Sequence, residues 1–193
     1  MDTLTFDSPL QLFINLTDEQ FWLLCHRNRE YRFEMNAQGE LTIIPPTGSD
    51  TGRRNFDIIV QLGIWNKKNK LGVAFESSTG FTLPNGAKRS PDASWIELSR
   101  WNSLTTEEQE KFAPICPDFV VELHSKTDAL KPLQDKMREY IDNGASLGWL
   151  IDRQNQQVEI YRVNQPVETV KSPNSLSGEN ILPNFTLDLT KIL

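Results

Sequence analysis

Two acidic residues, Asp92 and Glu122, stand where the sequence allows them to bind a metal ion. Asp92 follows Pro91 at the start of a predicted strand over residues 92–98, and Glu122 lies inside FVVELH, the apolar part of a predicted strand over residues 118–124. An unpaired charge inside a buried strand is costly, so Glu122 needs a partner. Two carboxylates on adjacent strands, with a cation nearby, can hold Mg²⁺ and activate a water molecule for attack on phosphorus.

Both carboxylates also allow a purely structural interpretation. Asp92 is typical of turn chemistry at the start of a strand. Because side chains alternate along a strand, Glu122 is expected to share a face with His124 and Lys126. Glu122 can therefore form a structural ion pair with Lys126 or with an arginine. His26 and His124 are isolated histidines, and neither is expected to act in catalysis.

The part of the chain before Asp92 predicts, in order, a helix, a β-hairpin and a second helix. Thr17 and Gln20 have the spacing of a capping box, which predicts the start of a short helix. YRFEM and ELTIIPP flank a polar turn at residues 36–39 and predict the hairpin. A helix over residues 50–70 is predicted by apolar residues at helical spacing, namely Phe56, Ile59, Val60, Gly63 and Ile64.

Three strands are predicted next, over residues 72–78, 92–98 and 118–124. A loop at residues 80–90 separates the first two, and a short helical piece at residues 106–112 precedes the third.

The last part of the chain predicts a helix over residues 128–143 and two strands. The helix carries an apolar stripe of Leu130, Leu133, Met137, Tyr140 and Ile141, with Pro132 in its first turn and Gly144 at its end. LGWLID (147–152) and VEIYRV (158–163) predict a pair of strands, and the tail at residues 166–183 is expected to be loop. The order helix, strand, strand, strand, helix, strand predicts an α/β fold with a mixed central sheet flanked by helices.

The length and composition of the chain are typical of a globular protein. The chain has 193 residues, of which 38% are hydrophobic and 24% charged, and this is typical of one globular domain over residues 1–193 with a core at about 50–165. No secretory signal and no apolar run of roughly 20 residues is visible, and Cys25 and Cys116 form no CxxC pair. We therefore expect a cytoplasmic protein without a membrane partner, a disulfide framework or a thiolate zinc site.

The net charge of −6 argues mildly against nucleic acid as a partner. Clustered carboxylates nevertheless suit a metal-dependent nuclease, in which a local basic groove can coexist with an acidic average. One candidate basic surface consists of Arg53, Arg54, Lys67, Lys68 and Lys70, which either contacts phosphates or is simply solvated.

Five segments carry a family resemblance: RFEMNAQGELTIIPPTG, RSPDASW around Asp92, PDFVVELHSKTD around Glu122, QDKMREYIDNG, and GWLID with the following VEIYR. In this order they resemble the PD-(D/E)XK nuclease superfamily, and more closely a bacterial family of proposed restriction endonucleases. The resemblance covers roughly residues 15–190. It implies a restriction-endonuclease-like core with an additional helix and hairpin at the N-terminus.

The resemblance also implies roles for individual residues. Asp92 and Glu122 would be the ligands of Mg²⁺ or Mn²⁺. The usual superfamily lysine, two residues after the acid, falls at His124, which is a departure. In the resembled family this lysine commonly comes from the next helix, here as Lys136, whose stem can lie on the core while its ammonium reaches the site. Glu34 matches an early acidic position and would be a third acidic member.

Without the resemblance, Lys136 is typical of a solvated lysine on a helix rim, and Glu34 of an exposed strand residue. Lys126 is the other candidate for the lysine, on the expected strand face but about 7 Å beyond the usual position.

The resemblance implies an endonuclease that uses Mg²⁺ to hydrolyse DNA phosphodiester bonds. A homodimer is expected if both strands are cut, because one site cuts one strand. The main alternative is a catalytically silent binding module on the same fold. An enzyme of another class has no support, since the sequence contains no Gly-rich phosphate loop and no Ser/His/Asp pattern.

Overall fold

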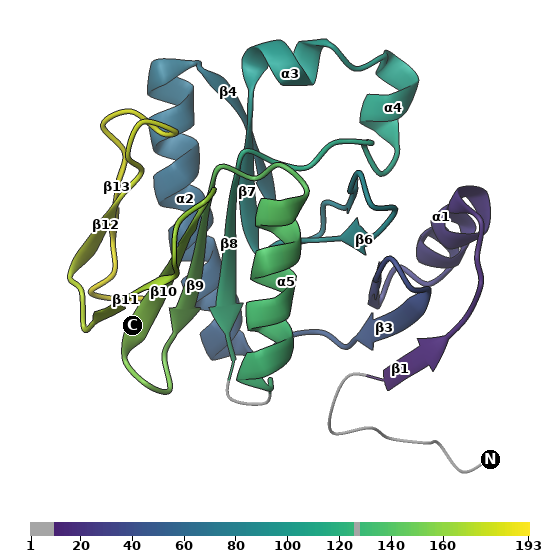
Figure 1. The fold of residues 1–193 in the computed structure, drawn as a ribbon, viewed down its shortest axis with the longest axis horizontal. Helices are drawn as coiled ribbons and strands as arrows, with labels where there is room; N and C mark the ends of the chain where they lie inside the picture. The colour runs from purple at the N-terminus through teal and green to yellow at the C-terminus, as the bar shows by residue number, and fades with distance from the viewer. Residues whose placement is uncertain (1–9, 126–127) are drawn as a thin grey trace.

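A six-stranded mixed sheet forms the centre of the molecule (Figure 1). The structure, a computed structural model, describes residues 10–125 and 128–193. The sheet has the order β11-β10-β9-β8-β7-β4, and β8 and β9 are its parallel pair while the other neighbours are antiparallel. Its strands are β4 (Gly72–Glu76), β7 (Ala93–Glu97), β8 (Phe119–His124), β9 (Leu147–Asp152), β10 (Gln157–Arg162) and β11 (Glu168–Lys171).

Two long helices cover the two faces of this sheet (Figure 1). Helix α2 (Ser49–Asn69) packs on the face that carries Phe119 and Val121 of β8. Helix α5 (Leu130–Asp142) packs on the face that carries Val120, and it forms the crossover that lets β8 and β9 run parallel. The predicted fold class is therefore confirmed: the sheet is mixed, it is flanked by helices, and its elements follow the predicted order.

A second sheet is built mainly from the N-terminal part of the chain. Its order is β1-β3-β2-β6-β5, and its strands are β1 (Leu10–Phe13), β2 (Arg32–Met35), β3 (Glu40–Ile44), β5 (Phe81–Thr82) and β6 (Lys88–Arg89). Helix α1 (Asp18–Arg27) begins with the predicted capping box, and β2 and β3 form the predicted hairpin. Phe33 and Met35 of β2 pack in the cluster that contains Phe21 of α1. The alternate residues of β2, Arg32 and Glu34, therefore face away from α1.

The segment at residues 80–90 was expected to be loop but contains β5 and β6. Strand β6 pairs with β2 through Met35 and Lys88. This pairing draws the chain that leads into β7 alongside β2, and so it brings the start of β7 next to Glu34. Helix α4 (Thr106–Glu110) corresponds to the predicted helical piece, and the short helix α3 (Leu98–Asn102) precedes it.

The predicted apolar stripe of α2 only partly faces the core. Phe56 and Ile64 are both 65% exposed, whereas Ile58, Leu62 and Trp65 are buried. The helix has apolar residues on two opposite sides, and helical spacing alone does not tell which side packs. The large ring of Trp65, which contacts Trp95 and Phe185, lies on the buried side.

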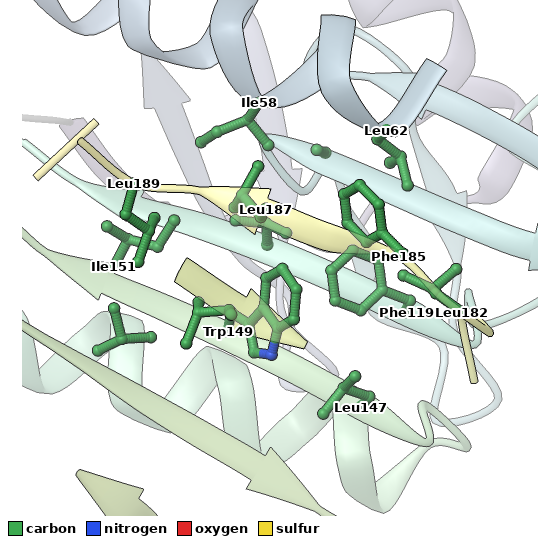
Figure 2. Close-up of a cluster of buried hydrophobic side chains, with 14 of the residues drawn as sticks. Ile58, Leu62, Phe119, Leu147, Trp149, Ile151, Leu182, Phe185, Leu187 and Leu189 are labelled. Atoms are coloured by element: carbon green, nitrogen blue, oxygen red, sulfur yellow. The ribbon is translucent and has the colours of Figure 1, made fainter. Parts of the chain in front are cut away.

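The expectation of a loop at residues 166–183 is wrong. This segment contains β11, which extends the central sheet, and β12 (Ser175–Ser177), which pairs with β13 (Thr186–Asp188). Most residues of the tail are polar, but a few apolar residues in it and just after it pack into the core and hold the segment in place. Figure 2 shows Phe185 and Leu187 gathered with Ile58 and Leu62 of α2 and with Trp149 of β9. Within the described ranges, no helix is both long and apolar enough to cross a membrane.

Truncation on the two sides of α2 should change the free energy of unfolding by very different amounts. Leu62→Ala removes a fully buried side chain and should lower the free energy of unfolding by about 2–5 kcal/mol. Ile64→Ala, two residues away on the exposed side, should change it by at most about 0.5 kcal/mol. Urea unfolding of both variants checks this, and equal losses would show that the exposed side is covered in solution.

Candidate active site

Asp92 and Glu122 come together on one face of the central sheet. Asp92 immediately precedes β7, and Glu122 lies in β8. The register pairs Ala93 with Val121, so continuing it by one residue sets Asp92 opposite Glu122. Residues opposite each other in an antiparallel pair share a face. A backbone contact fixes this arrangement, because the amide of Leu123 donates to Asp92 Oδ2 at 2.9 Å.

Two side chains from outside the central sheet contact the other carboxylate oxygen of Asp92, Oδ1. Asn55 Nδ2, from α2, donates to Asp92 Oδ1 at 3.2 Å. Arg32 Nη1, from β2, approaches the same oxygen at 3.4 Å. Asn55 Oδ1 is buried, and it has no hydrogen-bond partner within the described part of the chain. Asp92 is thus a buried carboxylate at the junction of both sheets and α2.

Lys136 joins the two acidic residues Glu34 and Glu122. Its Nζ lies 2.7 Å from Glu122 Oε1 and 2.7 Å from Glu34 Oε1. The side chain is only 10% exposed, and Nζ lies 5.8 Å from the centroid of the Tyr140 ring. Tyr140 also donates its hydroxyl to Glu122 Oε1 at 3.1 Å. The interpretation of Lys136 as a solvated helix-rim lysine is therefore wrong.

Glu34 is buried too, contrary to the interpretation as an exposed strand residue. Its Oε1 accepts a hydrogen bond from the amide of Ser90 at 3.1 Å. Its Oε2 lies 3.3 Å from Arg89 Nη1, and Arg89 Nε in turn lies 2.5 Å from Glu139 Oε2. Glu34 therefore lies between two cations, Lys136 and Arg89, and cannot move without disturbing both.

Burial and neighbouring charges give these groups unequal affinities for protons. Burial raises the pKa of Glu122 to about 7, Lys136 opposes this rise, and the charges of Asp92 and Glu34 add to it. Burial also acts to raise the pKa of Glu34, but Lys136 and Arg89 outweigh it and lower that pKa. The pKa of Lys136 is raised, since its two carboxylate partners outweigh the opposing effect of burial. Glu122 is thus the acid that titrates near neutral pH.

His124 occupies the position two residues after Glu122 but belongs to a separate polar cluster. Its Nδ1 lies 2.8 Å from Asp152 Oδ1, and its Nε2 lies 3.0 Å from the carbonyl oxygen of Asp128. Burial acts to raise the pKa of Asp152, but hydrogen bonds from Asn155 and His124 lower it overall. His124 therefore connects the ends of β8 and β9. Lys126, the other candidate lysine, lies outside the described residues, so the choice between it and Lys136 stays a prediction.

A cleft of about 930 Å³ reaches Asp92 from the surface. It lies between α1 with β2 on one side and the N-terminal end of α2 on the other. Its lining includes aromatic and basic side chains, among them Trp22, Arg29, Tyr31, Arg32, Asn55 and Arg153. The sequence did not suggest Arg32 or Asn55 as site residues. Strand alternation places Arg32 on the face of Glu34, which is a usable signal, whereas Asn55 reaches Asp92 only through long-range packing.

The donor set suits a hard cation bound through few protein ligands. In residues 10–125 and 128–193, no group of three or more acidic, histidine or cysteine side chains forms a metal cage. Asp92 and Glu122 offer carboxylate oxygens, and Glu122 Oε2 accepts no hydrogen bond from the residues that the structure describes. The unpartnered Asn55 Oδ1 adds an amide oxygen. Mg²⁺ binds through one or two carboxylates and keeps several waters, so these residues fit it.

The chain is similar to a solved structure over most of its length and matches one protein family. A similar solved structure is that of "a putative nuclease belonging to DUF820" from Anabaena variabilis, with 20% sequence identity and a TM-score of 0.70. The match covers 83% of this chain and 88% of the other, and it shows the shared restriction-endonuclease-like fold. Residues 18–190 match the Uma2 family, described as "Putative restriction endonuclease", and the chain belongs to this family. No curated protein matches the sequence.

The raised pKa of Glu122 predicts how stability depends on pH. Between its ordinary value of 4.5 and about 7, the unfolded chain loses the Glu122 proton while the folded protein keeps it. The wild-type protein therefore loses stability from this group as pH rises through that range. Glu122→Gln cannot ionise, so its stability relative to wild type should rise by roughly 2–3 kcal/mol between pH 4.5 and pH 8.

Chemical unfolding of both proteins across this pH range measures the effect. Parallel stability curves would show that Glu122 ionises in the folded protein as readily as in the unfolded chain.

Proposed function

We propose that this protein is a Mg²⁺-dependent endonuclease that hydrolyses DNA phosphodiester bonds. The observation that supports this most strongly is the convergence of Asp92, Glu122, Lys136 and Glu34, which come from four separate parts of the chain, beside an open cleft. Membership in the Uma2 family, whose description is "Putative restriction endonuclease", supports nuclease chemistry in particular.

Asp92 and Glu122 would hold the ion, and Asn55 would orient Asp92 through the hydrogen bond from its Nδ2. When bound, Mg²⁺ lowers the pKa of a coordinated water and offsets negative charge on a phosphate. Glu122 must be ionised to serve as a ligand, and its raised pKa makes it a better ligand above pH 7 than below it. Metal affinity should therefore fall as pH drops below neutral.

Lys136 would orient the attacking water or stabilise charge on the phosphorane. Its ammonium is already held at 2.7 Å from Glu122, and its raised pKa keeps it protonated. Glu34 fixes the other side of the same ammonium, and Arg89 fixes Glu34. The lysine is thus held in one place before any substrate arrives, which is the preorganisation that electrostatic catalysis requires. Cleavage of both DNA strands would use two copies of the chain.

Metal binding separates this proposal from a silent binding module. Calorimetric titration of the wild-type protein with Mn²⁺ should show binding, and Glu122→Ala should largely remove it. Glu159→Gln is the matched control, because Glu159 is also a buried carboxylate of the central sheet but bonds to Gln134 and Tyr161. Its affinity for Mn²⁺ should equal that of wild type. Unchanged affinity in Glu122→Ala would make Glu122 a structural residue.

The lysine can be tested by plasmid nicking with Mn²⁺. Lys136→Ala should lower the rate of nicking by about 10²- to 10³-fold, because it removes a positive charge that stabilises the transition state. Mn²⁺ binding should persist in this variant, since lysine is no ligand for the ion. Lys131→Ala, on the exposed side of α5, should nick like wild type.

Lys126→Ala completes the comparison, with thermal melting of each variant to show that it is folded. Activity lost in the Lys126 variant alone would overturn the assignment of Lys136. No nicking by any of these proteins, wild type included, would favour the silent module.

A further inference from the structure

Arg32 is a basic residue that contacts Asp92 and, like Asp92, lines the cleft. It lies two residues from Glu34 on the same face of β2, so one strand places Glu34 against Lys136 and Arg32 against Asp92. The side chain of Glu34 is only 4% exposed, but that of Arg32 is 33% exposed and lines the cleft. Arg32 is therefore both adjacent to the candidate metal ligand Asp92 and accessible from solvent.

The guanidinium of Arg32 has N–H groups that are not used by its contacts at Nη1. A guanidinium carries five N–H groups in a rigid plane. Arg32 Nη1 donates to the carbonyl oxygen of Ser77 at 3.1 Å and approaches Asp92 Oδ1 at 3.4 Å. In the part of the chain that the structure describes, neither Nε nor Nη2 of Arg32 makes a hydrogen bond. The contacts of Nη1 fix the plane of the guanidinium and leave the Nε–Nη2 edge open.

The other basic groups of the cleft are differently placed. Arg153 lies 2.5 Å from Asp50, which also pairs with Arg53 and Arg54, so its guanidinium is engaged in an ion pair with Asp50. Arg29, which follows α1, is exposed and lies beside the ring of His26. Arg32 alone in this group contacts a carboxylate of the candidate metal pair, and it remains charged at any ordinary pH.

We propose that Arg32 binds a DNA phosphodiester in this cleft, donating its Nε and Nη2 to the two non-bridging oxygens of a phosphate beside Asp92. The proposal rests on the proposed function and names the contact by which that site would hold its substrate. The planar fork of arginine matches two oxygens of one phosphate, which an ammonium cannot do. Trp22 and Tyr31 line the same cleft, whose volume of about 930 Å³ exceeds that of one phosphate ion, and this favours a nucleic acid over free phosphate.

Binding of DNA without metal tests the contact independently of catalysis. Fluorescence anisotropy of a short labelled DNA duplex, in EDTA and over a range of NaCl concentrations, gives the affinity and its salt dependence. Arg32→Gln should weaken binding by about 10-fold and make the slope of log K against log [salt] shallower by about 0.9, as expected for one lost phosphate contact. Arg32→Lys should keep the slope, because it keeps the charge, but lose part of the affinity.

Arg138→Gln is the matched control. Arg138 lies on the exposed side of α5 and pairs with Asp135, so this variant removes the same charge away from the cleft. Its affinity and slope should equal those of wild type. Inorganic phosphate, added at matched ionic strength, should displace DNA no better than NaCl does.

The outcomes separate this inference from the proposed function. If wild type binds DNA and Arg32→Gln binds equally tightly with the same slope, the role of Arg32 is wrong while the proposed function stands. Displacement by inorganic phosphate beyond the effect of NaCl would also overturn it, because the site would then accept free phosphate. If wild type binds Mn²⁺ but no DNA, both proposals fall. Thermal melting checks that each variant is folded, and the salt slope of Arg32→Lys decides the question if Arg32→Gln is unstable.

Discussion

The ion pairs of Lys136 with Glu34 and Glu122 are the interaction on which the rest of this structure depends. Three carboxylates are buried close together, since Asp92 lies on the same side as these two. Removing one partner from a buried ion pair typically costs about 3–5 kcal/mol, because it leaves an uncompensated charge. Lys136 also links three elements that are far apart in sequence, namely β2, β8 and α5. The same ammonium therefore makes the acidic cluster tolerable and fixes the N-terminal sheet against the central one.

The architecture around this lysine explains why the site is at once rigid and accessible. Strand β6 pairs with β2 and delivers the amide of Ser90 to Glu34, while Arg89 on the same strand pairs with both Glu34 and Glu139. These contacts lie on the buried side of the cluster. On the other side, Asp92 and Arg32 line the cleft. Strand β2 thus supplies Glu34 to the buried side and Arg32 to the cleft, because residues two positions apart in a strand lie on the same face.

The sequence predicts the parts of the site that local patterns determine. Glu122 is detectable because it is an acid inside an apolar strand, and Asp92 because it begins the neighbouring strand; register and alternation then place them together. Lys136 is not distinguishable by spacing from other helix-rim lysines, and only the family resemblance singled it out. Arg32 and Asn55 depend on which surfaces meet after folding, since Arg32 is sixty residues from Asp92 in sequence. The side of α2 that faces the core and the strands of the tail also depend on long-range packing. In both cases a few apolar residues pack against elements that are distant in sequence, and local patterns do not show this.

A crystal of the protein soaked with Mn²⁺ would show whether Asp92 and Glu122 bind the ion, because anomalous scattering locates it without reference to activity. We expect one strong peak between the carboxylates of Asp92 and Glu122, at about 2.2 Å from an oxygen of each, with Lys136 still bonded to Glu34. Metal–oxygen contacts from both residues would establish the pair as a metal site. Saturating Mn²⁺ with no peak there, or a peak held by other residues, would contradict it and leave the acidic cluster a structural feature of the fold.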